Sequence, residues 1–154
     1  MLLSQCCAWK TELNGFTVVE LLAVVTILGA LSALGVPKIQ QTVERARVAQ
    51  AIGDIHTFAL NLATQDTLPD KLSFGGPVPV DPWGNPYRYE KLPLKKKVPK
   101  NARKDRFQVP LNTQYDLYSM GKDGKTSAPL TAKASQDDVV RANDGGFIGL
   151  ASAY

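Results

Sequence analysis

The sequence predicts an α+β protein in which one long N-terminal helix carries a small sheet, and three observations lead to this prediction. Residues 16–36 form an almost unbroken apolar run in which Glu20 is the only charged residue. Apolar residues then continue at helical spacing as far as Leu62. Further along, short alternating segments lie between proline- and glycine-rich turns, as short strands do.

Residues 16–36 have the length and composition of a membrane-spanning helix. As an α-helix they would extend about 31 Å, enough to cross the hydrocarbon core of a bilayer. Glu20 needs an explanation, because a carboxylate at the bilayer centre costs about 3 kcal/mol on insertion scales. Either the headgroup region solvates it, or a cation of another chain pairs with it. Cleavage after Gly15 would create such a cation at the new amine of Phe16.

Residues 37 to about 64 predict the amphipathic second half of the same helix, which we expect to pack on a globular head. Apolar residues recur mostly three or four positions apart, with polar residues between them. The apolar positions are Ile39, Val43, Val48, Ile52, Ile55, Ala59 and Leu62.

The rest of the chain predicts turns and short strands. Residues 81–89, Asp-Pro-Trp-Gly-Asn-Pro-Tyr-Arg-Tyr, predict a turn that leads into a strand. Residues 107–109 and 115–119 alternate in the manner of strands, and residues 120–125 follow as a turn. About 118 residues after the apolar run are enough for one small domain.

Residues 15–22, Gly-Phe-Thr-Val-Val-Glu-Leu-Leu, resemble the processing signal of the type IV pilins and type II secretion pseudopilins. The resemblance implies that residues 1–15 are a leader, removed by prepilin peptidase after Gly15, and that the new amine of Phe16 is methylated. It implies that helix 16–36 is the membrane anchor and assembles into a filament through pairing of Glu20 with the Phe16 amine. A secretory signal peptide is the competing interpretation, but its cleavage site would follow the apolar run.

The same resemblance implies a pilin-like fold and a location. The helix would pack on a small antiparallel sheet with a long C-terminal loop region, and residues 81–87 are similar to the segment that enters the sheet of major pseudopilins. The chain would cross the bacterial inner membrane once, with residues 37–154 as a periplasmic head. Because Cys6 and Cys7 lie in the predicted leader, the mature chain would have no disulfide to hold its C-terminal region.

Residues 115–124 are similar to the start of the calcium loop of major pseudopilins. The resemblance implies one calcium ion, which would replace the missing disulfide as a tie. Calcium takes six to eight oxygen ligands, often from carboxylates and backbone carbonyls on flexible loops. The carboxylates carried over are Asp123, Asp137 and Asp138, and the carbonyls are those of Met120 and Lys125. The alternative is an ordinary acidic turn, because residues 126–136 separate the two halves of the loop.

Eight basic residues lie between Lys91 and Arg106, against the single acid Asp105. Such a segment could bind an anion, either nucleic acid or an acidic lipid or protein surface. The favoured interpretation is a solvated loop, because the segment lacks the aromatic residues that stack on bases, apart from the following Phe107.

The resemblance favours a structural subunit of a type II secretion pseudopilus. Its partners would be further copies of itself, minor pseudopilins, inner-membrane assembly proteins and prepilin peptidase. A type IV pilus subunit for adhesion, motility or DNA uptake is one alternative, and a non-polymerising, membrane-anchored periplasmic binding module is another. An enzyme is not expected, since His56 is the only histidine and no Gly-x-x-x-x-Gly-Lys phosphate loop is present.

Overall fold

The computed structural model describes residues 15–72, 76–93 and 98–154. One long helix, α1 (Val18–Ala63), precedes four strands. The strands are β1 (Arg88–Lys91), β2 (Tyr115–Ser119), β3 (Val139–Ala142) and β4 (Phe147–Leu150), with three short 3₁₀ turns among them. The structure divides into two compact units at Gln41, within α1. The predicted α+β arrangement is confirmed.

The first unit contains the part of α1 up to Gln41, and the apolar side chains of this part of the helix are exposed. Leu21, Val25 and Leu28 are all more than half exposed. By length and composition α1 is able to cross a membrane, and it is the one described helix with this property. A helix that exposes apolar residues on all sides requires an apolar environment outside this chain.

The four strands form one antiparallel sheet in the order β1-β2-β3-β4. The predicted strand at residues 115–119 is confirmed as β2. The predicted strand at residues 107–109 is wrong. Asp105 and Gln108 exchange backbone hydrogen bonds of 3.0 and 2.6 Å, which close a tight turn with Phe107 at its tip, 100% exposed. A residue at the tip of such a turn cannot pair with a neighbouring strand.

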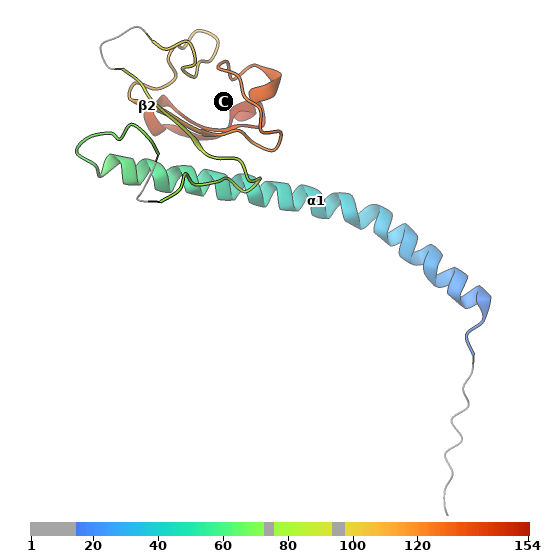
Figure 1. Ribbon diagram of the computed structural model, residues 1–154. Coiled ribbons are helices and arrows are strands. Elements are labelled where there is room, and N and C mark those ends of the chain that lie inside the picture. The colour runs from blue at the N-terminus through green and yellow to red at the C-terminus, as the bar shows by residue number, and fades with distance from the viewer. Residues whose placement is uncertain (1–14, 73–75, 94–97) are drawn as a thin grey trace, which may run out of the picture. The chain divides into compact units, whose positions relative to one another are not determined.

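The main core lies between the sheet and the outer part of α1, which runs along one face of the sheet (Figure 1). Ile55 and Leu62 of α1 are buried against Leu117 of β2 and Val139 of β3. Tyr87 joins this core, and its hydroxyl donates a 2.8 Å hydrogen bond to Asp54. The amphipathic half of the helix packs on the head, as its spacing predicts.

Loops cover the opposite face of the sheet and enclose a second core. Leu111 and Leu130 pack there on Val140, Ala142 and Ala151. Because side chains alternate along a strand, β2 presents Tyr115 and Leu117 to the helix and the intervening residues to the loops.

The predicted turn before the first strand is confirmed, and one buried carboxylate organises it. Asp81 Oδ1 accepts hydrogen bonds from the backbone N–H groups of Trp83 (3.1 Å) and Asn85 (2.8 Å). Its Oδ2 accepts a 2.6 Å hydrogen bond from the hydroxyl of Ser119 in β2. Asn85 in turn donates to the Gly121 carbonyl at 2.9 Å, so this turn also supports the loop that follows β2.

Candidate functional site

The N-terminal end of α1 is closed by a reciprocal pair of side chains. The backbone N–H of Glu20 donates to Thr17 Oγ1 at 3.2 Å, and Glu20 Oε2 accepts from the Thr17 backbone N–H at 2.9 Å. The Thr17 hydroxyl also donates to the same carboxylate oxygen at 2.9 Å. This arrangement is a capping box, which satisfies backbone donors that a helix start leaves unpaired.

The capping box gives Glu20 an intramolecular partner that the sequence analysis did not consider. Its signature, threonine followed by glutamate three residues later, is present at residues 17–20. Glu20 remains exposed, so its second carboxylate oxygen stays available to a group from outside the chain. The cap and a pairing between chains are therefore compatible.

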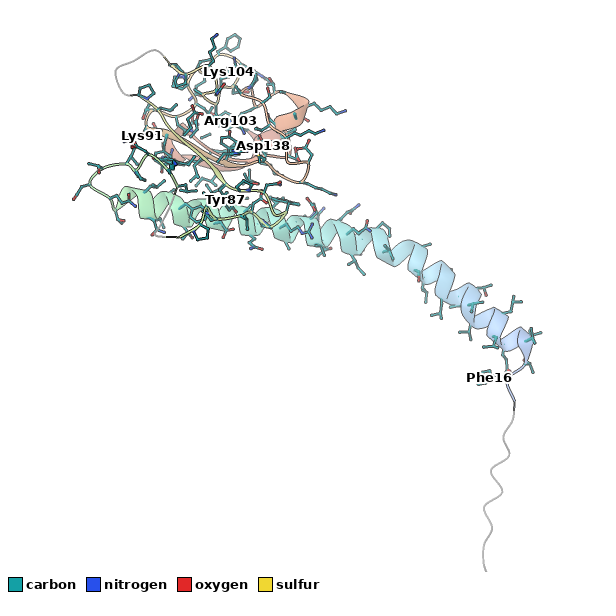
Figure 2. All side chains as sticks on the ribbon, in the orientation of Figure 1. Phe16, Tyr87, Lys91, Arg103, Lys104 and Asp138 are labelled. Carbon is teal, nitrogen blue, oxygen red and sulfur yellow. The ribbon has the colours of Figure 1, made fainter. Side chains whose placement is uncertain are left out.

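The predicted processing site lies just before the helix. Gly15 and Phe16 precede the first residue of α1, and Phe16 is 78% exposed (Figure 2). The backbone at this bond is not part of the helix. Residues 1–14 of the predicted leader lie outside the described residues.

In the head, the two halves of the predicted calcium loop meet at Gly121. Gly121 has a φ of +62°, and a Cβ built there would lie 2.3 Å from the backbone oxygen of Asp137. Asp137 Oδ2 accepts a 3.1 Å hydrogen bond from the backbone N–H of Asp123. The structure therefore brings Asp123 and Asp137 together, although residues 126–136 separate them in the sequence.

The third predicted carboxylate, Asp138, has a different environment. It is 0% exposed, and its Oδ2 lies 2.7 Å from Arg103 Nη2 and accepts a 2.5 Å hydrogen bond from the Thr126 hydroxyl. Its Oδ1 is buried without a hydrogen-bond partner. Burial raises the pKa of Asp138 to about 6, while Thr126 and Arg103 favour the ionised form.

The two remaining predicted ligands contribute backbone groups in different settings. Met120 is buried and its sulfur accepts a 3.4 Å hydrogen bond from Arg88 Nε, whereas Lys125 is exposed. Within residues 15–72, 76–93 and 98–154, no three carboxylate, histidine or cysteine side chains are grouped closely enough to hold a metal ion. The donors that fit a hard cation best are Asp123, Asp137 and the unpaired oxygen of Asp138.

The basic segment is not a uniform charged surface. Lys91 Nζ donates to the Leu68 carbonyl at 2.7 Å and lies 3.6 Å from Asp70. Arg103 is buried, whereas Lys100 and Arg106 are exposed. Lys95, Lys96 and Lys97 lie outside the described residues. Arg103 is therefore not part of a solvated loop, contrary to the interpretation favoured from the sequence.

Sequence reasoning missed Arg103 because no local signal separates it from the neighbouring basic residues. Its guanidinium lies 3.6 Å from the centre of the Tyr118 ring, and its backbone N–H donates to Asp116 Oδ2 at 2.7 Å. Both partners are on β2, more than ten residues further along the chain. Only the tertiary fold brings these groups together.

Comparison with known proteins identifies three relatives, all of which carry one name, type II secretion system core protein G. The chain is 34% identical over 142 residues to the type II secretion system core protein G of Pseudomonas aeruginosa, with 75% of this chain and 88% of the relative covered. It is 31% identical over 105 residues to the protein of that name from Aeromonas hydrophila, with 51% and 73% covered. For Vibrio cholerae the identity is 33% over 101 residues, with 49% and 69% covered. No family model and no solved structure matches the chain.

Proposed function

This chain belongs to the family of the type II secretion system core protein G, and from this premise we propose that it is a subunit of a helical pseudopilus filament. Prepilin peptidase cleaves it after Gly15, and the new amine of Phe16 is methylated. The apolar part of α1 anchors it in the inner membrane, with the head in the periplasm. Its partners are further copies of itself, minor pseudopilins and the inner-membrane assembly proteins.

The observation that carries this proposal is the exposed apolar stem with one carboxylate at its start. Residues 18–33 of α1 present apolar side chains on every side, which suits both a bilayer and the packing of neighbouring stems. Glu20 lies in the first turn of α1, four residues after Phe16, so the amine of a neighbouring chain could reach it at a similar depth. The relatives' name describes a secretion component, which favours a structural role over an enzymatic one.

Gly15→Leu is expected to block cleavage, filament assembly and secretion. A Cβ at Gly15 would meet no atom within 4 Å, so the substitution changes what the peptidase recognises without disturbing the fold. Mass spectrometry of the chain from cells with prepilin peptidase measures cleavage and methylation. Gly29→Ala is the matched control, because a Cβ is equally unhindered there, and it should be processed normally. Normal processing and secretion by Gly15→Leu would contradict the proposal.

The two alternative functions predict different results for the deletion of the gene and for the uncleaved Gly15→Leu chain. A type IV pilus subunit predicts long extracellular fibres and unchanged protein secretion when the gene is deleted. A non-polymerising binding module predicts that the uncleaved chain is fully active. The relatives' names give the secretion role priority over both.

We also propose that one calcium ion binds where Asp123 and Asp137 meet, with carbonyl oxygens of Met120 and Lys125. The hydrogen bond from the Asp123 backbone N–H to the Asp137 carboxylate and the unpaired Asp138 Oδ1 support this proposal. A ligand that binds only the folded state stabilises it by about 2.7 kcal/mol when the free ligand concentration is 100 times the dissociation constant.

Millimolar calcium is expected to raise the melting temperature of the full chain in detergent by several degrees over chelator. Asp123→Ala should abolish this rise because it removes one carboxylate ligand. Asp66→Ala, an exposed acid just beyond α1, is the control and should keep the rise. Near-ultraviolet circular dichroism measures the transition. An equal rise in all three proteins would show that calcium acts elsewhere.

A further inference from the structure

The side chain of Arg103 is a buried cation at the centre of the loop-covered side of the sheet. It is 2% exposed, and Figure 2 shows it beside Asp138. Arginine is not deprotonated in proteins, so its charge enters the interior intact. Burying an ion is costly unless its donors are paired and hydrogen-bonded. The partners of Arg103 therefore show what this part of the fold is built to hold.

Those partners come from several separate segments of the chain. Arg103 Nη2 donates to Asp138 Oδ2 at 2.7 Å and also to the hydroxyl of Thr126. Its Nη1 donates to the Ser127 carbonyl and, at 3.5 Å, to Ser135 Oγ. One face of the guanidinium stacks on the Tyr118 ring of β2. A planar guanidinium suits such a many-partnered site better than an ammonium does, and of its nitrogens only Nε is buried without a hydrogen-bond partner.

The loop around this cation has bonds of its own. The Ser135 hydroxyl accepts from the backbone N–H of Ser127 and donates to its carbonyl, both at 2.8 Å. Thr126 binds Asp138 as described above. The start and end of segment 126–138 are therefore joined to each other and to Arg103. Closing a segment of this length costs chain entropy, which these contacts offset.

Arg103 also restricts how a metal ion can use Asp138. A calcium ion lies about 2.3–2.6 Å from each ligand oxygen. Arg103 Nη2 already occupies the space 2.7 Å from Asp138 Oδ2, and the two cations would repel each other. The three carboxylates carried over from the family are therefore not equivalent here. Asp123 and Asp137 each accept a backbone N–H hydrogen bond and form no ion pair within the described residues, whereas Asp138 Oδ2 is paired with the arginine.

We propose that Arg103 is the resident cation of the C-terminal loop, and that it holds segment 126–138 closed without a metal ion. Calcium at Asp123 and Asp137 then adds stability to a loop that is already formed. This inference goes beyond the proposed filament function, because it concerns how the head folds. Melting of the head tests it, and no measurement of filament assembly is needed. It also gives one residue of the basic segment a structural role in place of an anion-binding one.

The test compares melting of the full chain in detergent, with excess chelator and with millimolar calcium. The unchanged chain is expected to melt cooperatively in chelator, within several degrees of its value in calcium. Arg103→Met should lower the melting temperature in chelator by about 10 °C or more, because it leaves Asp138 buried and unpaired. Calcium should then raise the variant's melting temperature by more than it raises that of the unchanged chain, since Asp138 Oδ2 loses its competing cation and keeps only the Thr126 hydroxyl as a partner.

Two further variants separate the role of the guanidinium from a loss of positive charge. Lys104→Met removes the adjacent cation, which forms no ion pair with any carboxylate in the described part of the chain, and should change the melting temperature by less than about 2 °C. Arg103→Lys keeps the charge and loses the planar fork, so its value should lie between those of the unchanged chain and Arg103→Met.

Two results would overturn the inference. One is an unchanged chain that loses its cooperative transition in chelator and regains it with calcium. The other is Arg103→Met melting at the same temperature as Lys104→Met. If Arg103→Met fails to fold at all, the chelator measurement on the unchanged chain still decides between arginine and metal.

Discussion

Glu20→Ala will abolish filament assembly while cleavage after Gly15 continues. Glu20 is the one carboxylate in the apolar run. Under the proposed function, it is the partner in the filament for the Phe16 amine of a neighbouring stem. Without it, that amine would have no counter-ion in an apolar environment, which is costly. Electron microscopy of sheared cell fractions measures filaments, and the size of the chain reports cleavage.

The capping box provides a second explanation for the presence of Glu20, besides pairing with the amine of a neighbouring chain. Two variants distinguish these two explanations. Glu20→Gln keeps an oxygen that can accept from the Thr17 backbone N–H but removes the charge. Thr17→Ala keeps the charge but removes the hydroxyl that accepts from the Glu20 backbone N–H. Pairing between chains predicts that Thr17→Ala assembles and Glu20→Gln does not. The opposite result would mean that Glu20 acts only as a helix cap.

Gly121→Ala will strongly destabilise the head. Its φ of +62° favours glycine, and a Cβ would lie 2.3 Å from the Asp137 backbone oxygen and 2.7 Å from its carbonyl carbon. Because backbone cannot rotate away as a side chain does, the two halves of the loop must separate. We expect the melting temperature of the full chain in detergent to fall by about 10 °C or more, since strain and broken loop contacts add.

Gly124→Ala is the matched control, because it introduces the same methyl group at a similar φ of +65°. There the new Cβ would lie 3.0 Å from Asn85 Oδ1, a side-chain atom that can shift. Its melting temperature should therefore fall by only a few degrees, reflecting the backbone conformation alone. Equal losses in the two variants would mean that the close approach of Gly121 to Asp137 does not matter.

Several elements of the fold could be predicted from local sequence. The helical spacing of residues 37–64 and the alternation of residues 115–119 each reflect one periodicity that the backbone imposes. The strands of the tail were not predicted, although Asn143-Asp144-Gly145 between two apolar segments is a hairpin signal. Asn143, Asp144 and Gly145 all have positive φ values, and they join β3 to β4.

At residues 107–109 the sequence predicts a strand that does not form. Their alternation resembles a strand, but a strand forms only where a neighbouring strand supplies hydrogen bonds. The fold instead uses Asp105 and Gln108 to close a turn on themselves. Three alternating residues contain too little information to distinguish these outcomes.

By itself, the sequence determined the stem of this protein, because an apolar run, a helical period and the motif around Gly15 and Glu20 are all local patterns. The tertiary structure alone decided the roles of Arg103 and Asp138. The energy of a buried charge depends on the groups around it, and here the hydrogen-bonding partners come from residues 12–35 positions away in the sequence. Composition reports that a segment is basic, but only the fold shows which of its charges is buried and paired.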